Sequence, residues 1–370
     1  DMPGASEDAR LGNLEAQTER AYGVIKMRTV RIKANKLNQL VNHGNVEFVD
    51  MNSPVEAFTR NARLAANEPI SNNGRPNRNG NGIGVAVLDS GLSTHKDVHK
   101  YENRQFTFLQ GANGTETALV DDFGHGTHVA GIISGDGNQS DSDVNRGFAF
   151  MSNLISLQVL NPHGRGHASN VIAALDWVLQ NAAAHNIRVV NMSIGKAVET
   201  EAANDPLVQT AEAVWDAGIT VVVSAGNYGR DGHFTVTSPG NARKVITVGS
   251  LSLNRTGDDL TDDFPSTYSS RGPTLYDHVL KQDLLAPGNR LVAPIPEIAD
   301  LRTDMPDRLV NCDARRCDHD YLRLSGTSMA AAVVSATAAL MLEDDSSLSP
   351  DTIKARLMRS ARKIDGDPTV

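Results

Sequence analysis

The sequence predicts an α/β fold in which a parallel sheet is flanked by helices on both faces, preceded by a small N-terminal α+β unit. Short apolar runs rich in Val and Ile recur over 85–88, 154–160, 188–194, 220–225 and 245–250. They are continuous rather than alternating, which is typical of strands buried on both faces. Helical patterns separate them, and strands that alternate with helices form right-handed crossovers in a parallel sheet.

The helical segments have recognisable faces and ends. Over 167–185 the apolar residues recur at the spacing of one helical face. A second helix is expected over 206–217, where a glycine follows and ends it. Near the C-terminus, Ser349 is in place to act as an N-cap and Pro350 as the first helical residue, so a helix is expected to follow.

The N-terminal residues form a separate polar unit. Over 1–58 the pattern predicts a strand at 25–32, a helix at 35–43 and a strand at 46–49. The remaining residues, 59–370, are then expected to form the larger domain. No basic and apolar leader precedes the unit, so we expect any signal peptide to have been removed.

Two further stretches are predicted to be loops. Residues 67–82 are rich in Asn, Gly and Pro, and residues 294–320 are polar and carry many charges. The second loop holds both cysteines, Cys312 and Cys317. They form either a small disulfide loop in an oxidising compartment or a pair of reduced surface thiols.

Composition limits the classes of partner. Hydrophobic residues make up 40% of the chain and charged residues 21%, as in a globular enzyme, and the formal net charge is −9. Nucleic acids and anionic membranes both bind basic surfaces preferentially, so neither is expected as a partner. No apolar run approaches the roughly 18 residues that a membrane span needs.

Two segments place an acid and a histidine where such sheets carry their sites. Asp89 ends the first predicted strand, and the site of a parallel sheet lies at the carboxyl ends of its strands. The glycines around this strand precede it, whereas a dinucleotide-binding loop must follow one, so that alternative fails. His125 lies between two glycines at the start of a helix. Either residue alone is more often structural, and a metal pair of His125 with His128 lacks a third ligand.

Two later segments supply an amide and a hydroxyl. Asn227 follows the predicted strand 220–225, and it is either a turn former or a hydrogen-bond donor to an oxyanion. Ser328 stands near the start of an Ala- and Val-rich helix. By default such a serine is an N-cap, whereas the functional alternative is a nucleophile assisted by the helix dipole.

Together these segments strongly resemble the subtilisin-like serine peptidases, the subtilases. The resemblance rests on Asp, His, Asn and Ser segments in that order within a parallel α/β pattern, and it covers about 80–361. Residues 191–195, 269–273 and 285–288 also resemble subtilase segments. The resemblance implies that Asp89 orients His125, that His125 is the base for the nucleophile Ser328, and that Asn227 contributes to an oxyanion hole.

The resemblance also implies where substrate binds. The walls of the pocket for P1, the residue just before the scissile bond, would be formed by two segments, namely Ser193, Ile194, Gly195 and Ser224, Ala225, Gly226. Because these walls are small, we expect a preference for large apolar or aromatic P1 residues. Substrate is expected to bind extended, as an added strand beside Ser193–Gly195.

Residues 1–58 resemble the later part of a subtilase inhibitory prodomain. Such a prodomain ends in an extended tail in the active site, and counting along the chain places that end at Phe58. We therefore expect a zymogen that cleaves itself between Phe58 and Thr59 and is inhibited by its own N-terminal segment. The alternative is an unrelated accessory domain.

Three features depart from the family pattern. Ala332 stands where subtilases typically have proline, four residues after the nucleophile, and Phe150 replaces a proline in a loop. The first is either a tolerated change or one that shifts Ser328 and favours peptide ligation. The acidic stretch 136–143 is either a solvated loop or a calcium site with oxygen ligands. The chemistry itself is expected to need no cofactor.

Two rival functions would use the same segments differently. A catalytically impaired subtilase fold that serves as a binding module would retain these residues but misplace them. A lipase or esterase would need a second glycine in the nucleophile-elbow motif, where this chain has Ala330. The expected partners are protein and peptide substrates, and the expected location is outside the cell.

Overall fold

The larger part of the chain, from residue 78 onward, is built on one mainly parallel sheet. The computed structural model describes residues 11, 14, 16–24, 26–42, 46, 49, 54–57 (backbone only), 78–98, 103–139, 145–253, 263–310 and 321–364. Nine strands follow the order β13-β12-β11-β9-β4-β7-β5-β6, with β14 also pairing with β12. They are β4 (Gly84–Asp89), β5 (Arg104–Thr107), β6 (Thr115–Thr117), β7 (Asn153–Gln158), β9 (Ile187–Met192), β11 (Thr220–Ser224), β12 (Ile246–Ser252), β13 (Phe264–Pro265) and β14 (Leu284–Pro287).

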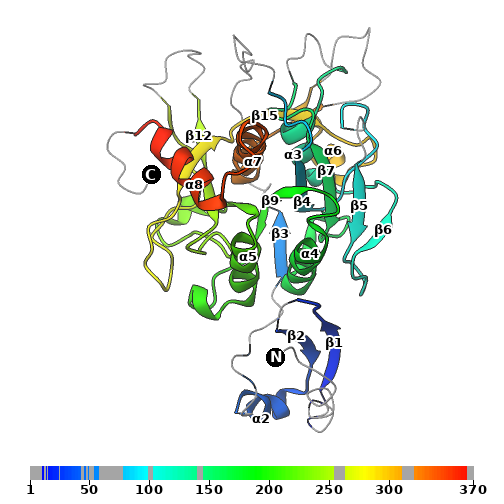
Figure 1. Ribbon diagram of the computed structural model, residues 1–370, viewed down its shortest axis with the longest axis vertical. Coiled ribbons are helices and arrows are strands. Elements are labelled where there is room, and N and C mark those ends of the chain that lie inside the picture. The colour runs from blue at the N-terminus through cyan, green and yellow to red at the C-terminus, as the bar shows by residue number, and fades with distance from the viewer. Residues whose placement is uncertain are drawn as a thin grey trace.

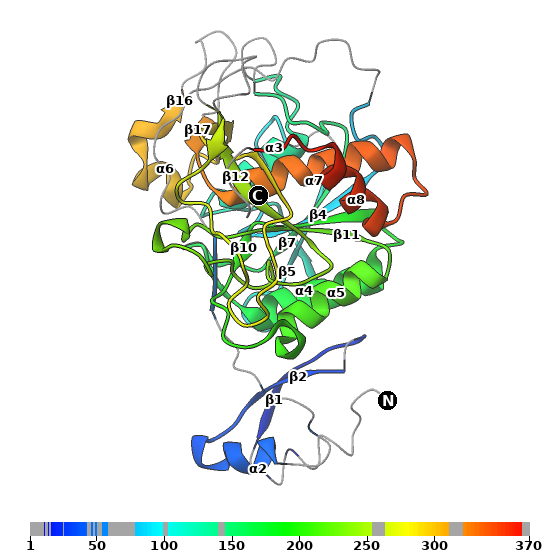
Figure 2. The ribbon, with the colours of Figure 1, turned by 90° about the vertical axis from the view of Figure 1, so that its left-hand side faces the viewer.

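Helices cover both faces of this sheet (Figures 1 and 2). Helices α3 (His125–Ser134) and α7 (Thr327–Asp344) lie on one side, and α4 (Ala168–Asn181) and α5 (Pro206–Asp216) lie on the other. The expected N-cap of α8 (Pro350–Ser360) is confirmed, because the Ser349 hydroxyl accepts from the Thr352 N–H. The predicted fold class is therefore confirmed.

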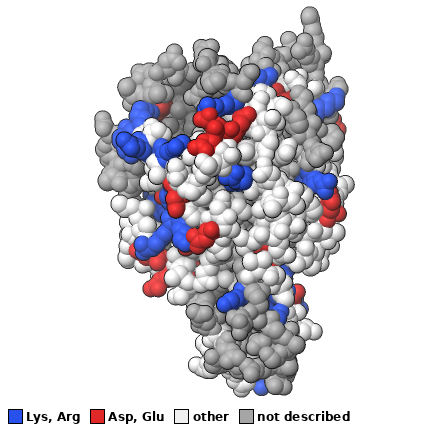
Figure 3. Space-filling model, viewed as in Figure 1, with Lys and Arg blue, Asp and Glu red and all other residues white. Residues whose placement is uncertain are grey.

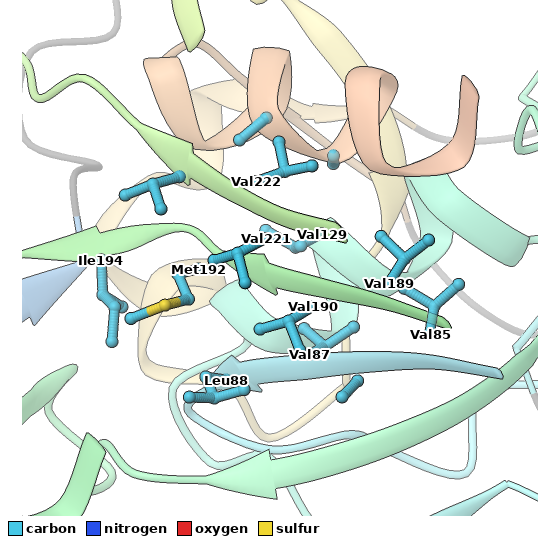
Figure 4. Close-up of a cluster of buried hydrophobic side chains, with 14 of the residues drawn as sticks. Val85, Val87, Leu88, Val129, Val189, Val190, Met192, Ile194, Val221 and Val222 are labelled. Carbon is cyan, nitrogen blue, oxygen red and sulfur yellow. The ribbon is translucent and has the colours of Figure 1, made fainter. Parts of the chain in front are cut away.

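The centre of the sheet is a dry layer of branched side chains. Figure 4 shows Val87, Val190 and Val221 of adjacent strands beside Met192 and Leu88. All five are at most 3% exposed. Burying each of these side chains contributes roughly 1.5–3 kcal/mol. The continuous apolar runs in the sequence arise because both faces of these strands are covered.

The stretch 294–320 is not simply a loop. Its described part contains α6 (Asp300–Asp304), the 3-10 turn η5 (Pro306–Arg308) and β16 (Leu309–Val310). β16 joins β15 (Leu291–Pro294) and β17 (Tyr321–Leu324) in a small antiparallel sheet. The prediction of a loop was wrong because these elements are too short to leave a periodic apolar pattern.

The N-terminal residues form a small α+β unit. β1 (Gln17–Ala21) pairs antiparallel with β2 (Arg28–Arg31), and a short helical segment follows as η1 (Ala34–Lys36) and α2 (Leu37–Val41). β2 falls within the predicted strand at 25–32, and the helical segment matches the predicted helix at 35–43. β1 was not predicted, because its residues are mostly polar and exposed. The predicted strand at 46–49 falls largely outside the described residues.

No helix in the described part of the chain is long and apolar enough to cross a bilayer.

Candidate active site

Asp89 and His125 form a buried hydrogen-bonded pair at the carboxyl end of the sheet. Asp89 is the last residue of β4, and His125 is the first residue of α3. The imidazole Nδ1 lies 2.8 Å from Asp89 Oδ1 and 2.9 Å from Oδ2. Both side chains are at most 1% exposed. A carboxylate on Nδ1 holds the ring in the tautomer whose Nε2 can accept a proton.

Ser328 lies in the first turn of α7 rather than at its N-cap. The N-cap is Gly326, so the default interpretation of Ser328 as a capping residue was wrong. Its hydroxyl donates to the carbonyl oxygen of Ser193 over 3.1 Å. Within the described residues, His125 Nε2 has no hydrogen-bond partner. Catalytic hydrogen bonds are often formed only in the complex with substrate. The orientation of the Ser328 hydroxyl is therefore compatible with transfer of its proton to His125 once substrate is bound.

Asn227 is oriented by the residue next to Ser328. Its side-chain Oδ1 accepts from the Thr327 N–H at 3.0 Å and from the Thr327 hydroxyl at 3.2 Å. These two donors fix which end of the amide is oxygen. The Nδ2 donor is therefore the end turned away from Thr327, which is the orientation that a donor to a developing negative charge needs.

A short strand of the chain itself lies in the expected substrate groove. β3 (Pro54–Ala57) runs antiparallel between β10 (Ile194–Gly195) and β8 (Arg165–His167). Its Ala57 pairs with Ile194 and its Glu56 pairs with Gly195. An extended segment can thus add a strand to this groove, which is the β-augmentation mode of peptide binding.

The comparisons with known proteins agree with this geometry. The family model described as the Subtilase family matches residues 80–370. The chain belongs to the subtilase family. The serine protease AprX of Bacillus subtilis (strain 168) is 35% identical over 359 residues, covering 94% of this chain and 77% of that protein. Subtilisin DY of Bacillus licheniformis is 28% identical over 287 residues, covering 77% and 85% respectively.

Solved structures of this family superpose on the chain. Sphericase gives a TM-score of 0.63 at 26% identity and covers 81% of this chain and 91% of its own. A cold-adapted subtilisin-like serine proteinase gives 0.59 at 27% identity, covering 81% and 90%. The chain is accordingly a serine endopeptidase of the subtilase family.

The two expected pocket segments of this subtilase are both buried, and they lie at the carboxyl ends of the adjacent strands β9 and β11. Ser193, Ile194, Ser224 and Ala225 are fully buried. The Ala225 carbonyl accepts from the Thr237 N–H at 3.0 Å, and Gly226 has φ +105°. A side chain at Gly226 would approach the Thr237 methyl to 2.9 Å. Thr237 therefore packs on this wall, a contact that the sequence did not indicate.

A buried polar chain fixes the turn that carries Ser328, and it was also missed. Ser335 donates to Asn191 over 2.9 Å, Asn191 donates to the Ser193 hydroxyl over 2.9 Å, and that hydroxyl donates to the Ser328 carbonyl over 3.0 Å. These side chains come from β9, the following residue and α7. No local sequence motif predicts this series of hydrogen bonds, because its members come together only when α7 packs on the sheet.

Asp121 organises the loop before His125. Its carboxylate accepts from the Ser90 hydroxyl, the Gly124 N–H and both the N–H and hydroxyl of Thr127, at 2.7–2.8 Å. Burial raises the pKa of Asp121, and these hydrogen bonds oppose the rise. An acid just before a helix start is a signal that could have singled it out.

His128 is a structural histidine. Its Nε2 lies 2.9 Å from the Leu322 carbonyl oxygen, and complete burial lowers its pKa to about 3. It therefore stays neutral and serves as a hydrogen-bond donor. Among the described residues no group of three or more His, Cys, Asp or Glu side chains converges as a metal site.

Several predicted features lie outside the described residues. These are the expected cleavage site at Phe58 and Thr59, the cysteines Cys312 and Cys317, and positions 140–144 of the acidic stretch.

Proposed function

We propose that the subtilase cleaves peptide bonds through an acyl-enzyme on Ser328. The hydroxyl oxygen attacks the carbonyl carbon while its proton passes to His125 Nε2. The C–N bond then breaks, and the same proton goes to the leaving amine. Water hydrolyses the resulting ester by the reverse proton route. The observation that carries this proposal is the Asp89 carboxylate within 2.9 Å of His125 Nδ1.

We assign the oxyanion hole to Asn227 Nδ2 and the backbone N–H of Ser328. Support comes from the two bonds with Thr327 that orient the amide. Removing one such donor typically lowers kcat by about 10²–10³-fold. Asn227→Ala is expected to show a loss of this size with KM little changed.

We propose a preference for large apolar or aromatic P1 residues. Ser193–Gly195 and Ser224–Gly226 would form its walls, and none of these residues has a side chain larger than that of Ile194. Initial rates on peptides that vary only at P1 test this preference. A higher kcat/KM for charged than for aromatic P1 residues would contradict it.

We further propose self-cleavage after Phe58 and inhibition by the N-terminal unit. The support is the register of β3, in which Ala57 pairs with Ile194 and Glu56 with Gly195. We assign the residue after Ala57 to the P1 position of that register. The chain would then be made as a zymogen whose residues 1–58 occupy the groove until they are released.

Contacts of the N-terminal unit support its role as an intramolecular inhibitor. The Arg20 guanidinium donates to the carbonyls of Ser169, Phe108 and Ala112, at 2.8–3.2 Å. The Asp176 carboxylate accepts the N–H groups of Gly23 and Val24, each at 2.7 Å. These bonds hold the unit against α4, on the side of the sheet from which β3 enters the groove (Figure 1).

A structural calcium ion is a separate proposal, for the acidic stretch that begins at Asp136. The described candidate ligand atoms there are the carboxylate oxygens of Asp136 and of its neighbour Asp97. Burial raises the pKa of Asp97 to about 6. Hard cations prefer such oxygen ligands. A thermal midpoint that falls on adding a chelator, and recovers with Ca²⁺, is expected. An unchanged midpoint would leave a solvated loop.

We place the enzyme outside the cell, because a peptidase made as an inhibited precursor can be exported before it becomes active. The distribution of peptidase activity between producing cells and medium tests this location.

Ser328→Ala is the decisive test of the mechanism and of processing. The variant should lose peptide hydrolysis and should keep residues 1–58 attached, whereas the unsubstituted chain should yield a new N-terminus at Thr59. Ser360→Ala, an exposed serine at the end of α8, is the matched control. Retained hydrolysis in Ser328→Ala would refute the assignment, and a processed N-terminus far from Thr59 would refute the cleavage site.

A further inference from the structure

One wall of the substrate groove carries an arginine on a rigid turn. In the turn before β8 the Asn161 side chain accepts the Arg165 N–H at 3.1 Å, and the Asn161 N–H donates to the Arg165 carbonyl at 2.8 Å. Gly164 within it has φ +70°, and a side chain there would meet the Phe123 ring at 2.4 Å. The backbone of Arg165 is therefore fixed, while its side chain is exposed.

The strand register places Arg165 beside one position of a bound chain. Glu56 of β3 pairs with Arg165 on one side and with Gly195 on the other. Side chains of directly opposed strand residues leave the sheet on the same face, with Cβ atoms about 4.5–5.5 Å apart. Because Gly195 has no side chain, Arg165 supplies the side chain of the two described residues that pair with this position.

We propose that Arg165 makes this subtilase prefer an acidic residue at P3, the third residue before the scissile bond. This inference rests on the proposed register, in which the residue after Ala57 is P1 and Glu56 is therefore P3. A carboxylate at P3 would lie across from the guanidinium and form an exposed, hydrogen-bonded ion pair. The chain's own tail supplies a glutamate at that position.

The charges around Arg165 leave this attraction in place. His163, two residues earlier, pairs with the Asp300 carboxylate at 2.9 Å. His167 follows on the same strand, and Lys196, beyond Gly195, is buried against Asp205 at 3.2 Å. The chain carries a net charge of −9, and acidic and basic side chains are mixed on the face in Figure 3. Because the net charge of the chain repels acidic substrates, a cation close to P3 is needed to favour an acidic residue there.

The experiment measures kcat/KM for three peptide p-nitroanilides with the processed enzyme. The peptides are acetyl-Val-Glu-Ala-Phe, acetyl-Val-Gln-Ala-Phe and acetyl-Val-Lys-Ala-Phe, which differ only at P3. The Glu peptide should exceed the Gln peptide by about 2–5-fold, as an exposed ion pair allows, with the Lys peptide lowest. The difference should lie in KM rather than kcat, and it should shrink at about 1 M NaCl, where the Debye length is about 3 Å.

Three variants separate this role from general effects of charge. Arg165→Gln should bring the Glu and Gln peptides to equal rates, and Arg165→Glu should reverse the order in favour of Lys. Arg104→Gln is the control: it removes the same charge from an exposed position on β5, a strand of the nine-stranded sheet and not of the sheet that holds β8, and should leave the order unchanged.

The outcomes distinguish two kinds of failure. Equal rates for all three peptides, or an order that Arg165→Gln does not alter, would overturn the P3 inference while leaving the peptidase intact. Hydrolysis of none of the peptides would instead overturn the proposed P1 preference or register on which the inference depends.

Discussion

At the scale of single residues, His125 is placed by the absence of a side chain beside it. A Cβ at Gly126 would lie 2.2 Å from the Gly91 carbonyl oxygen and 3.2 Å from the Asp89 Cβ. Real Cβ atoms do not approach backbone so closely, so Gly126→Ala must separate α3 from the end of β4. We expect kcat/KM to fall by about 10²-fold or more, because even about 1 Å of misplacement is that costly.

Gly111→Ala provides the comparison for this substitution. Gly111 has φ +83° and open space around its Cβ position. It should lose about 1 kcal/mol of stability through backbone strain while peptide hydrolysis is unchanged. Equal activity losses in the two alanine variants would show that the close approach at Gly126 is not what positions His125.

His128 gives the fold a defined sensitivity to acid. Its pKa is about 3 in the folded chain, against an ordinary value of 6.5. Between these values the unfolded chain binds the proton and the folded chain does not, so stability is lost as the pH falls from 6.5 toward 3. Measured in the Ser328→Ala background by urea unfolding, the loss between pH 6.5 and 5 should be smaller in His128→Gln by about 1–2 kcal/mol.

An identical pH dependence in the two proteins would show that His128 does not titrate in this way. The Ser328→Ala background removes self-digestion from the measurement, and glutamine retains a donor for the Leu322 carbonyl.

At the scale of single residues, the sequence predicted the candidate site residues better than the residues that hold them in place. Asp89 ends a strand, Asn227 follows one, and His125 begins a helix, each within a local motif, so their neighbourhood could be predicted from their order. Thr237 reaches the site from a distant segment, and Ser335 meets Asn191 only because α7 packs on the sheet. Such contacts depend on the packing of α7 and the loops, which no local pattern records.

At the scale of elements, the start of α7 decides how Ser328 is held. Ala332 is fully buried within an uninterrupted helix, and in such a helix its N–H pairs with the Ser328 carbonyl. That carbonyl also accepts the Ser193 hydroxyl. A proline at this position would remove the N–H and press on the same carbonyl, so it would shift the turn that carries Ser328.

We propose that Ala332 favours transfer of the acyl group to amines over hydrolysis. Ala332→Pro should therefore lower the ratio of peptide ligation to hydrolysis severalfold when a nucleophilic amine is added to a peptide ester. Product analysis by mass spectrometry gives this ratio directly. An unchanged ratio would mean that alanine is merely tolerated here.

The elements most easily predicted were those buried on both faces. β4, β9 and β11 have continuous apolar sequences because helices cover each side of them. β5 and β6 lie toward an edge of the sheet, are partly polar and were not predicted. Edge strands make fewer demands on side-chain type, so their sequences carry a weaker pattern.

At the scale of the whole molecule, the N-terminal unit is held by bonds between backbone groups and charged side chains. Asp176 is 3% exposed and accepts from Gly23 and Val24. Each hydrogen bond to a charged group contributes about 1.5–3 kcal/mol. Asp176→Ala should therefore shorten the interval between self-cleavage and full peptidase activity by about tenfold or more.

Gel analysis and peptide hydrolysis followed in parallel measure that interval. Asp216→Ala, which removes an exposed carboxylate from α5, is the matched control and should behave like the unsubstituted chain. If Asp176→Ala also behaves like the unsubstituted chain, the hydrogen bonds from Gly23 and Val24 to Asp176 do not retain the N-terminal unit.

The short strand β3 has a consequence for which proteins this enzyme can cut. β8 and β10 are three and two residues long, and among the described strands β3 is the one that joins them. If residues 1–58 are released as proposed, the missing strand would come from another chain that can extend several residues at once. A folded protein does so only where it opens locally, so its digestion rate should follow the population of that open form. The digestion rate of a folded protein should therefore depend on its local stability as well as on its sequence.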